Sequence, residues 1–388
     1  MTQFVQEAAE ASTKTAVASH LHPVGSFDVD AHPVPTGLEE IWRFTPLKRL
    51  RGLLDAAPLD GSDYVVDVRL DPAVTAGSVP GDHPAKGSSG YVPADRISAR
   101  AWQAAEKTFA VTVSADTIAE TPSVITLRGT DAATAAAGHL VIEAKPYSSA
   151  TIVVRFEGSA TLAENVEYVL GDGAQLTVVV VHAWDRDAVH ATHHHAKVGR
   201  DARLRHVVAT LGGDLVRVSS SVEYAGTGGD VQLIGLYFAD ADQHLEHRLF
   251  VDHNEPSTRS RVDYRGALQG RGAHTVWIGD VLIRKAAEGI DTYESNRNLV
   301  LTDGCRADSV PNLEIETGEI AGAGHASATG RFDDEQLFYL RSRGIPYEEA
   351  RKLVVRGFFA ELLAKVPVPE LVDQLTVVID ERLAKADA

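Results

Sequence analysis

The residues best suited to chemistry in this 388-residue chain are its histidines, of which there are sixteen. Four of them gather in the stretch HATHHHAK, at His190, His193, His194 and His195. Side chains two residues apart on a strand project to the same face, so His193 and His195 would lie side by side. With His190, or with His182 or His206 from a neighbouring turn, they form a candidate divalent-metal site.

The same stretch has a plainer interpretation. A cupin-type metal site would need a carboxylate shortly after the histidines, and none stands at that spacing. The alternative is a stacked polar face on a sheet. A second group, His244, His247 and His253, falls where a strand pattern resumes, and we expect these three side chains at the surface.

Cys305, the only cysteine, and His325 form a second candidate pair. One cysteine cannot make an intrachain disulfide, which is typical of a reducing cytosol. An iron–sulfur cluster needs about four ligands, mostly thiolates, so this chain cannot hold one unless another subunit shares it. The competing interpretations are a cysteine that packs as a small hydrophobic residue and a histidine that lies in a loop.

Composition and missing motifs exclude several classes of protein. The net charge of −17 opposes binding to nucleic acid or to anionic membranes. No apolar run approaches the ~20 residues of a membrane span, and the first twenty residues lack the apolar core of a secretory signal. The chain has no Walker-A string, complete Gly-x-Gly-x-x-Gly motif or Gly-x-Ser-x-Gly elbow. We expect a cytoplasmic protein whose partner is another protein or a small ligand.

Residues 1–120 are predicted to form a mixed, partly helical region. Thr45 followed by Pro46 marks a helix start, and leucines at helical spacing over 47–54 predict an amphipathic helix of about ten residues. The Pro-, Gly- and Ser-rich stretch from Ala76 is typical of a surface loop or linker. A second helix is expected around the sequence RISARAWQAAEK.

Residues 121–332 change to short β-branched runs separated by turns, which is typical of an all-β unit. Glycine-led turn strings recur at intervals of 28 and 27 residues, and a further one follows; they begin at Gly171, Gly199, Gly226 and Gly270. Self-similarity at this period predicts a solenoid, for which the parallel β-helix is the natural candidate. A cupin-like barrel or sandwich is the alternative.

Residues 333–388 are predicted to be helical. Asp333 and Gln336 have the spacing of a capping box, and Gly344 before Pro346 marks the end of one helix and the start of the next. Two more amphipathic helices follow, with expected apolar faces of Ala350, Leu353, Val354, Phe358 and Leu362, and of Leu371, Leu375, Val378, Ile379 and Leu383. We expect the three helices to cap the open end of the solenoid, where an uncovered turn leaves unpaired edges.

A run of specific motifs stands in the last third of the chain. They are Asn298-Leu299-x-Leu301, Pro311-x-Leu313-Glu314-Ile315, His325 followed by Gly330-Arg331, Asp333-Asp334-Glu335-Gln336, and Phe338-Tyr339-Leu340-x-Ser342-Arg343-Gly344. With these motifs the chain resembles the SufB/SufD family of iron–sulfur cluster assembly proteins. The likeness is strong from about Val251 onward and looser before it. Ala326 after His325 favours the SufD branch, because SufB resembles this pattern but carries Glu there.

The resemblance implies a right-handed parallel β-helix flanked by an N-terminal helical or mixed region and a C-terminal helical domain. It also implies a non-catalytic subunit of a SufBCD complex, which pairs with a SufB-like paralogue and docks a SufC-like ABC ATPase on its C-terminal helices. We expect no tightly bound cofactor in the lone chain. A transient iron–sulfur cluster would be shared with the paralogue.

The same resemblance suggests roles for individual residues. His325 would lie at the interface with the paralogue, and Cys305 near the cluster, with its role as a ligand open. SufD-branch chains often carry Cys two residues before this histidine, where Ala323 stands here. The ATPase-docking candidates are Asp333, Glu335, Gln336, Tyr339, Arg341, Arg343 and Tyr347. The rival function is a cupin-like metal enzyme that uses His190, His193 and His195.

Overall fold

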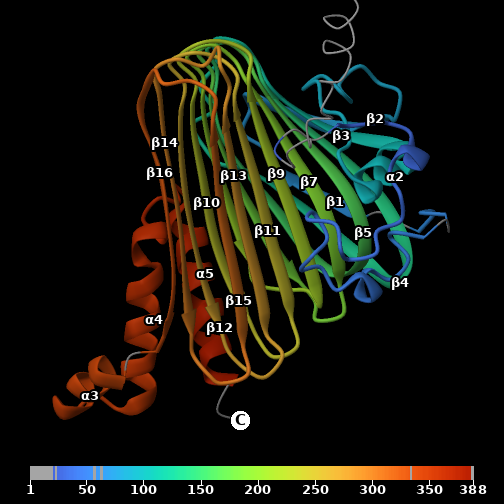
Figure 1. The fold of residues 1–388 in the computed structure, drawn as a ribbon. Coiled ribbons are helices and arrows are strands. Elements are labelled where there is room, and N and C mark those ends of the chain that lie inside the picture. Colours follow the sequence, from blue (N-terminus) through green and yellow to red (C-terminus); the bar gives the residue numbers. More distant parts are fainter. Residues whose placement is uncertain (1–20, 22–23, 56–57, 62–63, 333, 386–388) are drawn as a thin grey trace, which may run out of the picture.

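A long stack of parallel strands dominates the computed structural model, which describes residues 21, 24–55, 58–61, 64–332 and 334–385 (Figure 1). About half of the chain is strand, wound into a parallel β-solenoid of about eight turns with a few helices near the C-terminus. The solenoid prediction is therefore confirmed. The cupin-like barrel is wrong as a fold.

Each turn of the solenoid gives one strand to each of two facing sheets. The odd-numbered strands stack in the order β5 to β15, and the even-numbered strands from β6 to β16, while the long β5 takes part in both sheets. The bounds of the first half are β4 (Ser123–Ala144), β5 (Ser149–Leu170), β6 (Gln175–Trp184), β7 (Val189–Val198), β8 (Arg203–Thr210), β9 (Leu215–Tyr224) and β10 (Asp230–Ala239). Those of the second half are β11 (His244–His253), β12 (Arg259–Leu268), β13 (His274–Ile283), β14 (Ile290–Val300), β15 (Arg306–Ile315) and β16 (Ile320–Arg331).

Strands one turn apart pair in parallel and in register, so equivalent side chains stack in columns. Leu176, Leu204 and Val231 form one such column, with each side chain at most 2% exposed. Because alternate residues of a strand face opposite ways, every second side chain points into the solenoid. Burying each large aliphatic side chain contributes about 1.5–3 kcal/mol.

The repeated glycines mark the corners of successive turns. Gly199 donates its N–H to the carbonyl of Leu170 at 2.9 Å, which stacks the corner before β8 on the corner before β6. Gly226 begins the next corner of this edge. Gly270 lies between β12 and β13, at the opposite edge of the solenoid, so its place in the repeat was wrong.

The N-terminal region covers the early turns of the odd-numbered sheet (Figure 1). Its elements are η1 (Val29–Ala31), η2 (Leu47–Leu50), β1 (Val65–Arg69), β2 (Val74–Pro80), α2 (Arg96–Ala104) and β3 (Lys107–Val113). The helix predicted at RISARAWQAAEK is confirmed as α2. Asp95 and Ser98 exchange a capping box at its start.

One N-terminal prediction was wrong, and a second was confirmed only in part. The ten-residue helix is only the 3₁₀ helix η2, because Arg51 and Gly52 adopt positive φ angles of 47° and 86°. The stretch from Ala76 begins as β2 and then packs down as a loop. Glu167 holds that loop by accepting the backbone N–H of Gly87 at 2.7 Å and of Ser89 at 3.1 Å, so it is not a linker.

Three helices end the described chain: α3 (Asp334–Ser342), α4 (Tyr347–Leu363) and α5 (Pro369–Lys385). Their predicted role as an end cap was wrong. The helices α4 and α5 pack along the outer side of the even-numbered sheet, where Val355 and Phe359 join a cluster with Val179, Val207 and Ile234 (Figure 1). The strands beneath them are apolar on both faces, and this is the surface that the helices bury.

The apolar face predicted for α5 is confirmed, since Leu371, Leu375, Ile379 and Leu383 are buried. The face predicted for α4 is partly wrong. Leu353 is 46% exposed, whereas Val355 and Phe359 are fully buried. The sequence of α4 carries two adjacent apolar stripes. The stripe that contains Val355 and Phe359 packs against the sheet, and the one that contains Leu353 does not. In the described parts of the chain, no helix is both long and apolar enough to cross a membrane.

Truncating Phe359 tests the packing of α4 on the sheet. We expect Phe359→Ala to lower the free energy of unfolding by about 3–5 kcal/mol, because a fully buried ring is replaced by a cavity. Denaturant unfolding measures the change. Leu353→Ala on the exposed stripe is the matched control, with an expected change within about 0.5–1 kcal/mol. Equal losses in the two variants would contradict this packing.

Candidate functional site

The last turn of the solenoid, made by β15 and β16, is an open end. In the described part of the chain no strand pairs with the far side of either one, and the helices lie elsewhere. Ser327 of β16 and Ser309 of β15 meet across this turn, with their hydroxyl oxygens 2.8 Å apart. Unpaired strand edges of this length are normally covered by another chain or segment.

His325 lies at the mouth of this open end. It stands on β16 two residues before Ser327, so its side chain leaves the strand on the same inward side, and it is exposed. One turn below, it is in register with Glu294 of β14. Ala323, on the same side of β16, packs partly against the interior.

Cys305 lies just before β15, at the corner of the same turn, and is partly buried. Its thiol donates to the carbonyl of Gly270 at 3.3 Å. Arg331 pairs with Asp303 at 2.7 Å, which places this corner beside the end of β16. His325 is six residues away along that strand, about 20 Å. The structure puts both candidates in the last turn, with His325 midway along β16 and Cys305 at the corner before β15.

Glu294 is a residue that the sequence reasoning missed. It is 1% exposed, and neither carboxylate oxygen has a hydrogen-bond partner among the described residues. Burial, followed by repulsion from Asp280, raises the pKa of Glu294 to about 8. The available signal was the strand alternation, in which Thr292, Glu294, Asn296 and Asn298 are successive inward positions.

The rest of the mouth is a connected polar network. Asn296 donates to the Tyr237 hydroxyl at 2.9 Å, and Tyr237 donates to the side-chain oxygen of Asn298 at 2.7 Å. Ser309 donates to the side-chain oxygen of Asn296 at 2.8 Å, which carries the network to the open end. These hydrogen bonds fix polar side chains near Glu294, while both oxygens of its carboxyl have no partner among the described residues.

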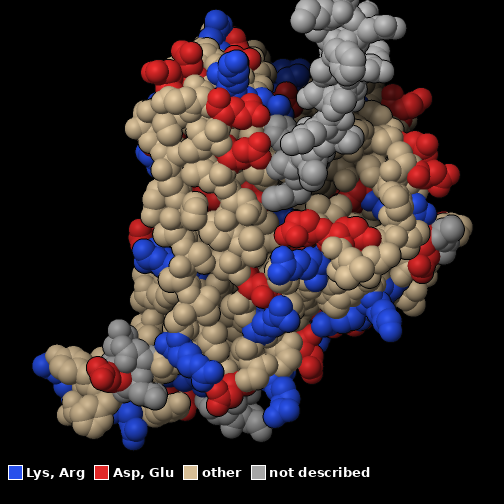
Figure 2. All heavy atoms as spheres, viewed as in Figure 1, with Lys and Arg blue, Asp and Glu red and all other residues tan. Residues whose placement is uncertain are grey.

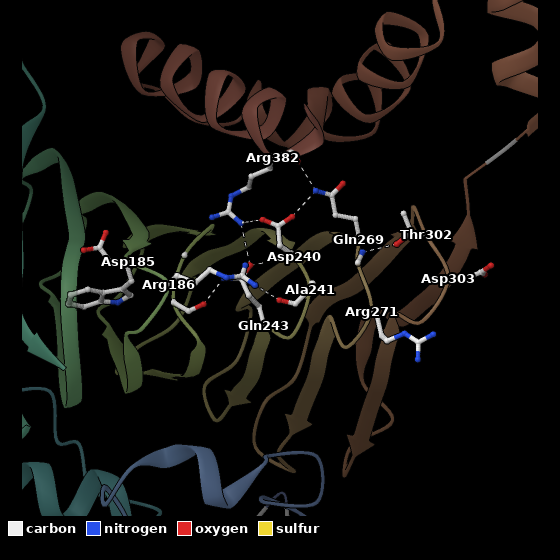
Figure 3. Close-up of a pocket in the computed structure, with 14 residues that line it drawn as sticks. Asp185, Arg186, Asp240, Ala241, Gln243, Gln269, Arg271, Thr302, Asp303 and Arg382 are labelled. Atoms are coloured by element: carbon white, nitrogen blue, oxygen red, sulfur yellow. Dashed lines mark hydrogen bonds and ion pairs between the residues drawn. The ribbon is translucent and has the colours of Figure 1, made fainter. Parts of the chain in front are cut away.

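A groove of about 730 Å³ runs beside Cys305, along the corners that join the even strands to the odd strands (Figure 3). Arg382 reaches from α5 to Asp240 at 2.7 Å, and the Arg186 guanidinium donates to the carbonyl of Ala241. Asp303 faces away from this pair and is held by Arg331. Three acidic and three basic side chains line the groove, and among them Arg382 and Asp240 pair with each other.

The histidine stretch on β7 does not form the predicted metal site. His193 and His195 do share a face, and each lies 2.8 Å from the Ser221 hydroxyl beneath the ring of Tyr91. His190 instead points into the solenoid, where it accepts from Trp184. No group of three or more His, Cys, Asp or Glu side chains in the described ranges is arranged to hold a metal ion.

Burial corrects a further expectation about histidines. His244, His247 and His253 are at most 1% exposed and do not lie at the surface. His182 and His206 also lie in the interior, where burial depresses the pKa of His206 to about 3. These imidazoles are polar parts of the buried core, because the solenoid hides both faces of their strands.

The docking candidates lie around α3, which extends away from the solenoid (Figure 1). Asp333 lies outside the described residues, as does the side chain of Gln336. Glu335 is exposed. The other four form two cation–π contacts: Arg343 lies 4.6 Å from the Tyr339 ring, and Arg341 lies 5.8 Å from the Tyr347 ring. Phe338, 74% exposed, adds apolar surface here, and Figure 2 shows this arm projecting with charges of both signs.

The fold and this end define a class: a β-solenoid protein whose terminal turn is open and lined by polar side chains. Residues 126–358 match the model of a known family, described as the SUF system FeS cluster assembly SufBD core domain. The chain is also 54% identical to an iron–sulfur cluster assembly SufBD family protein of Mycobacterium tuberculosis, over 92% of this chain and 91% of that one. This chain therefore belongs to the SufBD family of iron–sulfur cluster assembly proteins.

More distant relatives refine the comparison. The iron–sulfur cluster assembly protein SufD of Bacillus subtilis is 27% identical over 64% of this chain and 58% of its own length. In Mycobacterium bovis two SufBD family proteins match, one at 54% identity and one at 24%. The second match covers 52% of this chain but only 24% of the relative, which is a much longer protein.

The raised pKa of Glu294 predicts a pH dependence of stability. The protonated carboxyl favours the folded state, so this stability is fully present below about pH 4.5 and is lost as the pH rises through about 8. We expect a loss on the order of a few kcal/mol in the wild type. Glu294→Gln should lack it.

Denaturant unfolding between pH 5 and pH 9 measures this difference. Glu106→Gln, which removes an exposed carboxylate, is the control and should follow the wild type. Parallel pH profiles of the wild type and Glu294→Gln would show that the carboxyl is not held in its neutral form.

Proposed function

We propose that this chain is the SufD-type subunit of a cytoplasmic SUF complex, without catalytic activity of its own. In this proposal it pairs with a longer SufB-type paralogue and docks an ABC-type ATPase. The family is established by the comparisons above. The finer assignment is supported by the relatives named SufD and by the second SufBD protein of Mycobacterium bovis.

The observation that carries the proposed pairing is the open last turn. The edges of β15 and β16 offer unpaired backbone groups to a strand of another chain. Many side chains there are small or polar, such as Ser309, Ser327 and Ala328, so another backbone can approach closely. A paralogous solenoid that meets this end would continue the stack and bury His325.

A shared end also accounts for the incomplete ligand set. One cysteine and one histidine lie about 20 Å apart along the last turn, so this chain alone cannot surround a cluster. We propose that the nascent cluster is a cargo held transiently between the subunits, with thiolates from the paralogue. His325 would contribute an imidazole, and Cys305 would lie at the far corner of the same interface.

The arm around α3 is the proposed ATPase-docking surface. Exposed aromatic rings with stacked arginines, here Tyr339 with Arg343, are typical of the central contacts of protein interfaces. The arm projects beside the open end, so movement of a docked ATPase could be passed to the interface through α4. Nucleotide binding would then bias that interface between two states.

A long cation at the open end tests the pairing. We expect Ser327→Arg to reduce capture of the paralogue from the native cytosol at least tenfold, because the guanidinium would block the approaching strand. The measurement is an affinity pull-down in which the bound chains are identified. Ser78→Arg, an exposed serine on β2 in the N-terminal region, is the matched control. Undiminished capture by Ser327→Arg would contradict pairing through this end.

A second variant tests the docking surface separately. We expect Tyr339→Ala to capture at least tenfold less ATPase and as much paralogue as the wild type. The substitution removes the exposed aromatic ring and with it the surface on which the Arg343 guanidinium stacks. The same pull-down measures both partners. Tyr147→Ala is the control, since this tyrosine is 63% exposed at a solenoid corner. Retention of the ATPase by Tyr339→Ala would refute docking on this arm.

A further inference from the structure

Glu294 occupies an unusual place in the solenoid. It is fully enclosed, yet only one layer of side chains separates it from the open end. Its column contains Val262 one turn below and His325 one turn above. The carboxyl therefore has an apolar neighbour on its inner side and an exposed imidazole on its outer side.

The space around this carboxyl is created by a glycine. Gly279 lies on the facing strand β13, and a Cβ added there would stand 2.4 Å from the Trp277 ring and 2.8 Å from the Glu294 oxygen Oε1. An alanine would therefore press on both the indole ring and the carboxyl. The residue above Gly279 is Pro311, which has no N–H to donate. Nothing in the described residues neutralises or hydrogen-bonds this carboxyl.

A buried carboxylate without a partner is strongly unfavourable, so the Glu294 carboxyl keeps its proton unless a cation binds there and displaces that proton to solvent. Parallel strands lie about 4.8 Å apart, so in-register side chains on β14 and β16 can contact one ion between them. A carboxylate and an imidazole are both ligands that ferrous iron accepts. The open end leaves the remaining coordination positions of such an ion free for groups from another chain.

We propose that Glu294 binds a ferrous ion together with His325, as a second ligand from this chain at the open end of the solenoid. This inference rests on the proposed function for the origin of its cargo, but the binding itself requires only this chain. This chain supplies two ligands from one column of side chains, and groups from another chain would complete the coordination shell of the ion. Cys305 is too far along the turn to take part.

Anaerobic calorimetric titration of Fe²⁺ into the purified full-length chain tests the proposal. We expect one Fe²⁺ per wild-type chain, and at least a tenfold weaker affinity for both Glu294→Gln and His325→Ala. The double variant should be no weaker than about the weaker single variant, because both ligands hold the same ion. Glutamine has nearly the shape of a protonated glutamic acid, so the variant should fold.

Glu164→Gln is the matched control. Glu164 is equally buried, and its carboxylate lies 3.4 Å from His190, but this pair lies on β5 and β7, in the early turns of the solenoid. Its removal should leave Fe²⁺ affinity unchanged. A thermal melt gives a second readout, since Fe²⁺ should raise the Tm of the wild type and of Glu164→Gln but not that of Glu294→Gln.

Three results would overturn the proposal: wild-type affinity in Glu294→Gln, an equal loss in Glu164→Gln, or no Fe²⁺ binding by the wild-type chain. None of them bears on the proposed pairing, which is measured by the capture of the paralogue. Glu294 is enclosed, so Glu294→Gln should capture the paralogue as the wild type does. Loss of capture by Ser327→Arg with intact Fe²⁺ binding would affect the proposed function alone.

Discussion

The in-register stacking of parallel strands is the constraint on which the rest of this structure depends. Each strand of the solenoid satisfies its backbone groups through the strands one turn before and one turn after it. This pairing extends the fold by repetition but does not end it, because among the described residues no strand follows the last turn. The same hydrogen bonds that stabilise the interior therefore create an unsatisfied edge at β15 and β16.

Stacking also fixes what that edge presents. Columns of equivalent side chains run the length of the solenoid, so the last turn displays the final residue of each column. Most columns end in small or polar residues, and one ends in His325, with Glu294 one turn beneath it. The polar mouth follows from the choice of a few inward residues in the last two turns, without any change in the backbone.

The regular spacing of the turns in the sequence predicted the solenoid architecture. Corner glycines such as Gly171 and Gly199 recur because every turn has nearly the same length, and this regularity distinguishes a solenoid from a barrel. The spacing alone did not show to which edge Gly270 belongs, because glycines occur at the corners of both edges of the solenoid. The α5 face was predictable from one clean apolar stripe, whereas α4 carries two stripes, and only the shape of the sheet decides between them.

The errors at the candidate sites have one physical cause. Histidines read as surface residues or metal ligands, such as His247 and His190, lie inside because both faces of many solenoid strands are covered. A strand buried on both faces reads as continuously apolar. The sequence QLTVVVVHAW of β6 has that character, and it marks the face on which α4 and α5 pack. A strand that is apolar on both faces indicates that helices cover its outer face, and this would have placed the C-terminal helices along the sheet and not at the open end.

The open end explains why the motifs alone could not define a complete site. His325 and Cys305 were identifiable by resemblance, yet a cluster cannot form on two ligands about 20 Å apart. Glu294 carries no motif, and its importance comes only from what surrounds it: an apolar neighbour, a missing side chain at Gly279 and no hydrogen bond. An ionised carboxyl at this buried position is unfavourable for an isolated chain. Its place beneath an unpaired edge is best understood if the working state of this protein has both the edge and the carboxyl occupied.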